Sequence, residues 1–171
     1  MPATTLFDAL SDAKARLTPV TDTASLDAQV LLAHVLGESR AHVIAHRERV
    51  LTTDQHNRYS ALLQRREQGE PVAYLVGKRA FYDREFIVSP AVLIPRPETE
   101  HLVEIALKFG RKHPNLTTIA AGTGSGAIIV TLKANLPNMT AYATDISDEA
   151  LAIARQNADA NQANVTFFQG D

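Results

Sequence analysis

Five consecutive residues, Gly122-Thr123-Gly124-Ser125-Gly126, have the composition of a ligand-binding loop. They follow a short apolar run and precede a helical pattern, so the loop is predicted to join a strand to a helix. Glycine tolerates positive φ and lets a ligand approach the backbone closely. The helix behind the loop presents unpaired N–H groups and the positive end of its dipole. The pattern therefore predicts a small-molecule site.

An acidic residue, Asp145, ends the next expected strand, 23 residues after Gly122. A carboxylate about 20 residues on can accept hydrogen bonds from both hydroxyls of a ribose. The ligand is therefore expected to carry a nucleoside. The third glycine comes one residue earlier than in the dinucleotide fingerprint G-x-G-x-x-G, and this tighter loop favours S-adenosylmethionine over a diphosphate. The alternative interpretation is a glycine-rich turn that binds nothing.

Other candidate groups have weaker patterns. Asp171 closes the third expected strand, where it either lies near an adenine ring or is a surface carboxylate. His42 and His46 have helical i, i+4 spacing, but no carboxylate completes a metal-binding pattern, so solvated histidines and no metal site are expected. Interleaved glutamates favour an ordinary solvated face over a basic docking surface for four arginines: Arg47, Arg49, Arg65 and Arg66.

Composition limits the class of protein that these groups can serve. The chain has 171 residues, 45% of them hydrophobic, and a net charge of −2. The near-neutral charge argues against direct nucleic-acid binding, and no apolar run approaches the roughly 18 residues that span a membrane. The first residues lack the pattern of a secretory signal. The absence of cysteine excludes disulfides and a cysteine nucleophile, and it fits a cytoplasmic location.

Residues 1–70 are predicted to form a bundle of about four helices. Leu6, Leu10, Ala13 and Leu17 step along one helical face. Further helices are expected over residues 26–36, over residues 41–45, and after the capping-box pair Thr52 and Gln55. Residues 71–93 are β-branched and aromatic, from Val72 to Val88, and predict a linker with a β-hairpin.

Residues 94–171 are predicted to form a partial α/β domain with a parallel sheet. The two X-Pro steps in 94–97 indicate extended backbone, after which Pro97 suits the first position of a helix. That helix is expected to bury one face formed by Leu102, Ile105, Ala106 and Phe109. Strands are then expected over residues 116–121, 139–144 and 165–168, alternating with helices over residues 125–135 and 147–161.

Three stretches together resemble the N5-glutamine methyltransferases of peptide chain release factors, the HemK/PrmC family. They are residues 71–77, residues 81–100 with the string I-P-R-P-E-T-E, and residues 122–127. The string of seven residues is the most specific of them. The resemblance implies an N-terminal helical bundle, a β-hairpin linker and the first half of a class I, Rossmann-like methyltransferase domain.

The resemblance also implies an activity in translation termination. A methyl group would pass from S-adenosyl-L-methionine to the side-chain amide nitrogen of the Gly-Gly-Gln glutamine of a release factor, which the helical domain would help to dock. By match of motif, residues 122–126 would line the methionine and ribose end of the cofactor, and Asp145 would hold the ribose. The cofactor pocket would also be bordered by Arg96, Pro97, Glu98 and Thr99.

Two departures from the family pattern qualify these expectations. Ala120 stands where the family has an acidic residue that orients the cofactor, and losing such a polar group costs about 1–3 kcal/mol, or tenfold to a hundredfold in affinity. The catalytic Asn-Pro-Pro-Tyr motif does not occur in these 171 residues, so no catalytic residue is assigned. The chain alone is therefore expected to lack a methyl-acceptor site.

A sheet that stops after its third strand would leave residues 116–121 as an open edge, which invites self-association. Two alternatives to a methyltransferase for release factors remain at this point. One is a non-catalytic module that binds a release factor or the cofactor. The other is an N-methyltransferase for a different amide or amino group.

Overall fold

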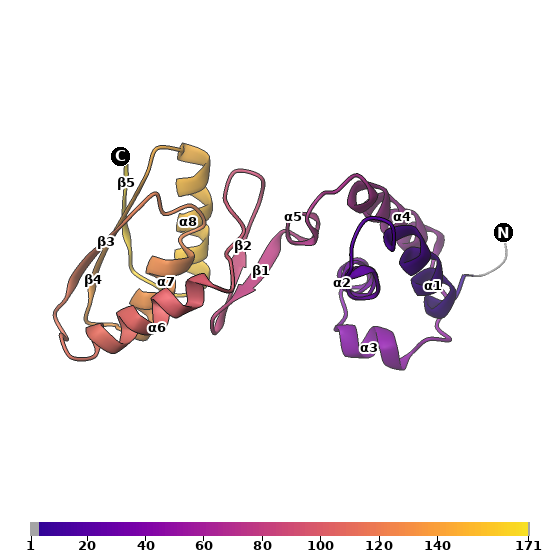
Figure 1. Cartoon of the computed structure of the whole chain (residues 1–171), viewed down its shortest axis with the longest axis horizontal. Coiled ribbons are helices and arrows are strands. Elements are labelled where there is room, and N and C mark those ends of the chain that lie inside the picture. The colour runs from indigo at the N-terminus through magenta and orange to yellow at the C-terminus, as the bar shows by residue number, and fades with distance from the viewer. Residues whose placement is uncertain (1–3, 171) are drawn as a thin grey trace. The chain divides into compact units, whose positions relative to one another are not determined.

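The computed structural model describes residues 4–170, which form two compact units (Figure 1). The first unit ends at Val76 and the second begins at Gly77. The expected linker over residues 71–93 is therefore not a separate part of the chain, because its first residues pack in the first unit and its hairpin packs in the second. Within the described residues, no helix is long and apolar enough to cross a membrane.

The first unit is the helical bundle that the sequence predicts. Its helices are α1 (Leu6–Leu17), α2 (Ala24–Leu36), α3 (Arg40–Ala45), α4 (Thr53–Glu67) and α5 (Val72–Val76). Capping boxes begin α1 at Thr5 and α4 at Thr52, and α2 ends at Gly37 with a φ of +68°. The core contains the fully buried side chains of Leu6, Leu17, Leu31, Leu32 and Leu63.

Helix α5 corrects part of the linker expected over residues 71–93, where β-branched and aromatic residues favour strands. The carbonyl of Pro71 accepts hydrogen bonds from the N–H groups of Tyr74 at 3.0 Å and Leu75 at 3.2 Å, which closes a helical turn. Leu75 is buried in the core of the first unit, and α5 packs on α2 and α4. The strand preference of the valines in this segment is overridden because burial of the helix stabilises it more than local propensity opposes it.

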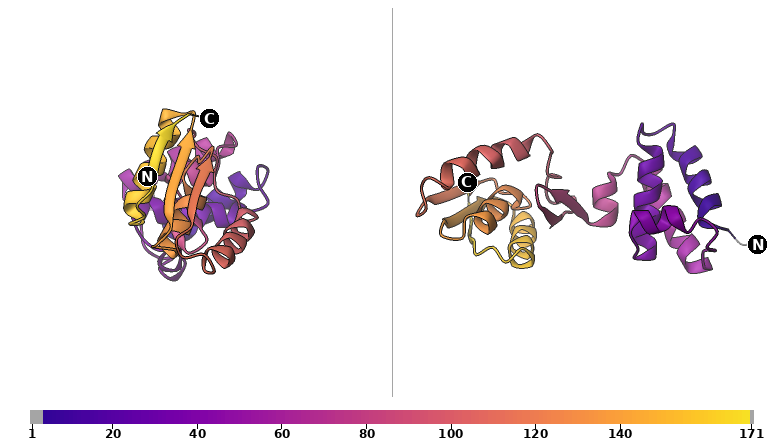
Figure 2. Two further views of the ribbon diagram at one scale, coloured as in Figure 1. Left: turned by 90° about the vertical axis from the view of Figure 1, so that its left-hand side faces the viewer. Right: turned by 90° about the horizontal axis from the view of Figure 1, so that it is seen from below.

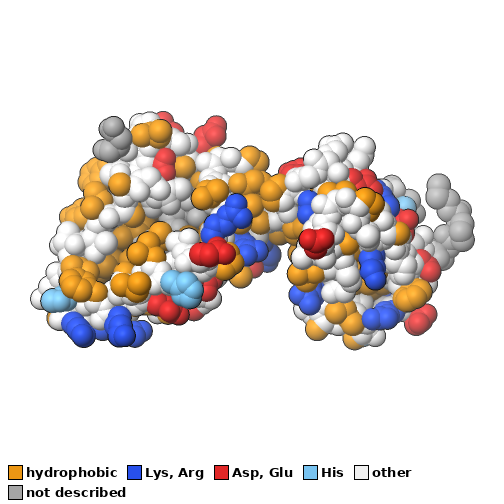
Figure 3. Space-filling model, in the orientation of Figure 1, with side chains coloured by type: hydrophobic (Ala, Val, Ile, Leu, Met, Phe, Trp, Pro, Cys, Tyr) orange, Lys and Arg blue, Asp and Glu red, His pale blue; other side chains and the backbone are white. Residues whose placement is uncertain are grey.

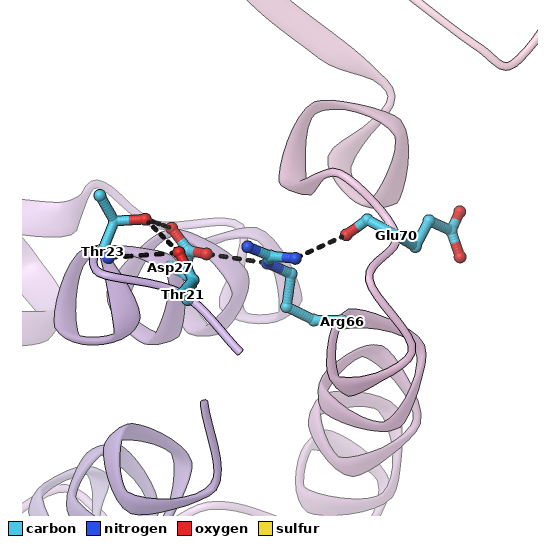
Figure 4. A network of polar contacts seen from close by, with 5 residues as sticks. All are labelled: Thr21, Thr23, Asp27, Arg66 and Glu70. Atoms are coloured by element: carbon cyan, nitrogen blue, oxygen red, sulfur yellow. Dashed lines mark hydrogen bonds and ion pairs between the residues drawn. The ribbon is translucent and has the colours of Figure 1, made fainter. Parts of the chain in front are cut away.

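A buried ion pair joins α2 to α4 in the first unit (Figure 4). The Nε of Arg66 donates to Oδ2 of Asp27 at 2.8 Å, and the Thr23 hydroxyl donates to the other carboxylate oxygen at 2.9 Å. Only 14% of the Arg66 side chain and 9% of the Asp27 side chain are exposed. The solvated face predicted for the four arginines is therefore wrong for Arg66, whose partner lies 39 residues away in the sequence.

The second unit begins with a β-hairpin of β1 (Lys78–Phe81) and β2 (Arg84–Ile87). Phe81 pairs with Arg84, so the turn consists of residues 82 and 83. Tyr82 adopts a φ of +56°, and its N–H donates to Oε1 of Glu100 at 3.0 Å. The hairpin predicted within residues 71–93 is confirmed.

The parallel sheet of the second unit is confirmed by three strands in the order β3-β4-β5. The strands β3 (Thr117–Ala121), β4 (Thr140–Asp145) and β5 (Thr166–Gln169) alternate with α7 (Ala127–Asn135) and α8 (Asp148–Ala160). Ala141 and Ala143 are buried on the face that α7 and α8 cover. The strands lie in front of these helices in Figure 2, left, where the opposite face of the sheet is open. Ile119 and Phe168, on that open face, are 63% and 52% exposed.

Helix α6 (Thr99–Gly110) corrects a second expectation. It begins two residues after Pro97, and it buries Val103 and Leu107 against the core that includes α7. Of the face expected to be buried, Leu102, Ile105 and Phe109 are each more than half exposed, whereas Ala106 is partly buried against the core. The helix carries two apolar stripes. Its packing on α7 buries the stripe with Val103 and Leu107 and not the stripe that was expected to be buried. The space-filling view shows hydrophobic side chains at the surface of this unit (Figure 3).

Candidate functional site

The glycine loop, residues 122–126, connects β3 to α7 as predicted. Gly122, Gly124 and Gly126 have φ values of +62°, +54° and +79°, a region that disfavours any residue with a Cβ. The N–H of Thr123 donates to the carbonyl of Thr144 at 2.9 Å, so the loop is attached to the end of the neighbouring strand. The loop is thus a defined turn at the carboxyl ends of the strands.

Asp145 lies directly beside this loop, at the end of β4. Its Oδ2 accepts the N–H of Gly124 at 2.8 Å, and its Oδ1 accepts the N–H of Ser147 at 3.0 Å. A carboxylate has about four acceptor positions, so this half-buried group can still accept hydrogen bonds from two hydroxyls. The structure therefore brings together the glycine loop and Asp145, which the sequence analysis predicted to form one site.

The same contact bears on the chemistry of the ligand. The N–H of Gly124 already donates to a carboxylate, so it is not available to a phosphate at that position. The negative charge of Asp145 would also repel a phosphate. The arrangement suits a ligand that presents hydroxyl donors to the end of β4, and it favours a nucleoside without a phosphate there.

Asn157 of α8 is a residue of this region that the sequence analysis missed. Its side chain is fully buried, and its Nδ2 donates to the carbonyls of Ser125 and Ile87, each at 2.9 Å. Its Oδ1 accepts the N–H of Ile87 at 2.6 Å. An asparagine among the apolar residues Ala150, Ala154 and Ala158 of one helix face is the signal that could have revealed it, because a buried amide needs partners.

The loop also packs tightly on α8. A Cβ added at Gly126 would lie 3.3 Å from the Cβ of Ala154 and 3.3 Å from Cγ2 of Val130. Both neighbours are fully buried, so neither can move aside easily. Gly126 is therefore required for two reasons: the turn needs a positive φ there, and α8 packs too closely for a side chain.

The remaining predicted site residues are less closely connected. Arg96, Pro97 and Glu98 are exposed and lead into α6, whose first residue, Thr99, is half-buried. The N–H of Thr99 donates to the carbonyl of Arg96 at 3.0 Å. None of the hydrogen bonds described for residues 96–99 reaches the glycine loop, so their place beside the pocket stays a prediction. Asp171 lies outside the described residues.

Ala120 pairs with Ala143 in the sheet and contributes no polar group to the site. The histidines at positions 42 and 46 lie in the first unit, where their rings stack 3.9 Å apart. Among residues 4–170, no cluster of three or more histidine or acidic side chains is arranged to hold a metal ion.

Comparison with known proteins identifies relatives of both units. Residues 8–77 match the model of the PrmC N-terminal domain, and residues 119–171 match that of a methyltransferase domain. A release factor glutamine methyltransferase of Koribacter versatilis is 45% identical over 151 residues, which cover 88% of this chain and 54% of that protein. Its counterpart in Coxiella burnetii is 42% identical over 165 residues, covering 96% and 60%. The Bacillus subtilis protein is 39% identical over 171 residues, covering 98% and 59%.

These matches confirm the family resemblance drawn from the sequence. The chain spans between half and two thirds of the length of these relatives.

Proposed function

Because the chain is similar to release factor glutamine methyltransferases over most of its length, we propose that it forms the cofactor-binding and partner-docking part of such an enzyme. The observation that carries the proposal is the hydrogen bond between Asp145 and the glycine loop, at 2.8 Å. It supports the proposal because it holds a carboxylate with spare acceptor positions next to backbone that a ligand can approach, which is what a ribose site requires.

The cofactor in this proposal is S-adenosyl-L-methionine, which supplies a methyl group bonded to a positively charged sulfur. Asp145 would accept hydrogen bonds from the ribose hydroxyls, and residues 122–126 would face the methionine and ribose. The residues present fit this ligand because the carboxylate suits hydroxyl donors and its charge opposes a phosphate. Residues 96–99 would border the same pocket.

The substrate would be the Gly-Gly-Gln glutamine of a peptide chain release factor, and the bundle of the first unit would help to bind that protein. An amide nitrogen is a poor nucleophile because its lone pair is delocalised, so transfer depends on positioning it by hydrogen bonds. The Asn-Pro-Pro-Tyr motif that would do this in the family is not among these 171 residues. We therefore expect the 171-residue chain by itself to bind but not to transfer.

Two measurements test the proposal. Calorimetry with S-adenosylhomocysteine should detect binding to the chain and a clear loss of affinity in Asp145→Ala. Incubation with labelled S-adenosylmethionine and a release factor should give no transfer. Absence of cofactor binding would overturn the proposed cofactor role, and robust transfer would overturn the claim that the missing motif is required. Release-factor binding without cofactor binding would favour the non-catalytic module, and transfer to another acceptor in a substrate panel would favour a different N-methyltransferase.

A second proposal concerns self-association through the sheet. Among the strands of residues 4–170, β3 pairs with β4 alone, and along its other side runs a groove of about 360 Å³. Its lining includes Phe109, Thr118 and Leu132. A second copy of the chain presents the same strand, so the two edges can pair with each other and shelter both grooves. Sedimentation should then show concentration-dependent dimers that Ile119→Lys weakens, and a monomer at all concentrations would contradict this. The proposed methyltransferase role also implies a cytoplasmic protein that contacts neither membranes nor nucleic acid directly.

A further inference from the structure

We infer that Asn157 is a positioning residue for the glycine loop, through its hydrogen bond to the carbonyl of Ser125. The inference rests on the proposed cofactor site, and it assigns a role to a residue that would not touch the cofactor. Asn157 lies on α8, outside the motif that marks the loop, and is 32 residues away from Ser125. Its side chain is fully buried, so water does not compete for its partners.

The three hydrogen bonds select an asparagine at this position. Both N–H bonds of the amide are used, toward the carbonyls of Ser125 and Ile87, and the oxygen takes the N–H of Ile87. An aspartate has the same shape, but its second oxygen would face two carbonyl oxygens instead of donating to them. The carbonyl of Ser125 would then be buried without this partner and would be repelled.

The contact acts on the loop because Ser125 lies between two glycines. Gly124 and Gly126 both have positive φ and little intrinsic preference for one conformation, so contacts from outside must hold the turn. Asp145 holds the turn at Gly124 from the strand side, and Asn157 holds it at Ser125 from the helix side. Ala154, one turn earlier on α8, packs against Gly126.

The same side chain also binds both backbone groups of Ile87, in the manner of a neighbouring strand. Asn157 therefore couples the hairpin strand β2 to the glycine loop. A change that displaces β2 is therefore expected to shift the Asn157 side chain and, with it, the loop at Ser125.

A matched pair of variants tests the inference. Asn157→Asp removes the donors to the loop and to β2. Asn161→Asp, at the residue that caps the C-terminal end of α8, removes no donor to the loop. It removes a 3.3 Å hydrogen bond to the carbonyl of Glu85 in β2 and a 2.9 Å hydrogen bond to the backbone carbonyl of Asn157. At pH 8, amide exchange of residues 122–126 should become at least tenfold faster in Asn157→Asp and stay within twofold in Asn161→Asp. The affinity for S-adenosylhomocysteine should fall at least tenfold in the first variant only.

Lowering the pH should partly restore the loop in Asn157→Asp, because a protonated carboxyl can again donate to one carbonyl. Unchanged loop exchange in folded Asn157→Asp, or equal effects of the two variants, would overturn the inference. If Asn157→Asp fails to fold, NMR of the unsubstituted chain decides. The side-chain amide signals of Asn157 should then shift when S-adenosylhomocysteine binds, those of Asn161 should not, and an unmoved Asn157 signal would overturn the inference.

The two proposals can fail separately. A chain that does not bind the cofactor, but whose loop exchange still responds to Asn157→Asp, would overturn the proposed function and leave the positioning role supported. Normal cofactor binding with a loop that ignores the substitution would do the reverse.

Discussion

Replacing Arg66 by methionine should strongly destabilise the first unit, whereas the same change at Arg65 should have little effect. The two arginines are adjacent in α4 and each pairs with a carboxylate. They differ in exposure, which is 14% for the Arg66 side chain and 51% for the Arg65 side chain. Asp27, the partner of Arg66, is 9% exposed, whereas Glu70, the partner of Arg65, is 27% exposed.

The expected magnitudes follow from this difference. Removing one member of a buried pair strands the other charge and costs about 3–5 kcal/mol. Thr23 still donates to Asp27 at 2.9 Å after the change, so we expect the lower end, about 3 kcal/mol. The Arg65 pair is exposed, so solvent screens it and Arg65→Met should lose little stability. Arg66→Met should therefore be clearly the less stable of the two variants.

Native-state hydrogen exchange of amides in α2 and α4 measures this difference, because it reports the opening of the first unit separately from the second. A double variant, Asp27→Leu with Arg66→Met, should recover much of the lost stability, since no charge then remains buried without a partner. Equal destabilisation by Arg66→Met and Arg65→Met, within about 0.5 kcal/mol, would refute the reasoning, as would a double variant less stable than Arg66→Met alone.

Three further predictions concern other parts of the chain. Asp145→Asn should weaken S-adenosylhomocysteine binding about tenfold to a hundredfold by calorimetry, because an amide has one acceptor oxygen where two are used, and Asp148→Asn controls for the lost charge. Gly126→Ala should lower the melting temperature more than Gly124→Ala, because both require a positive φ but only the first meets side-chain atoms within 4 Å. The hydrogen bond from Arg16 lowers the pKa of Glu67 below its ordinary value of 4.5, so this carboxylate contributes stability above that pH and loses it as the pH falls through the lowered pKa. Glu67→Gln should flatten that acid limb of the stability profile.

The strand–loop–helix arrangement around residues 122–126 could be predicted because its signals are local. Glycines, an apolar run and an acid at a fixed distance act through backbone geometry, and the contact between Asp145 and Gly124 follows from parallel strands ending at one edge. The buried roles of Arg66 and Asn157 could not be predicted in this way. Each depends on a partner at least 32 residues away, which only the packing of the helices brings close.

Local propensity also failed where two packing solutions compete. Val72 and its neighbours favour a strand in isolation, but the core of the first unit accepts Leu75 on a helix. Helix α6 offers two apolar stripes, and hydrophobic periodicity alone does not say which of them α7 covers. Tertiary contacts make the choice, so Val103 is buried, and Ile105, which was expected to be buried, is exposed.

The two backbone hydrogen bonds to Asp145 have a consequence for the speed of binding. They hold the carboxylate in one rotamer before any ligand arrives. Immobilising a free side chain on binding typically costs about 0.5–1.5 kcal/mol, and here most of that ordering belongs to the folded state. A nucleoside should therefore meet a preorganised acceptor, with an association rate limited by diffusion and orientation rather than by rearrangement of this residue.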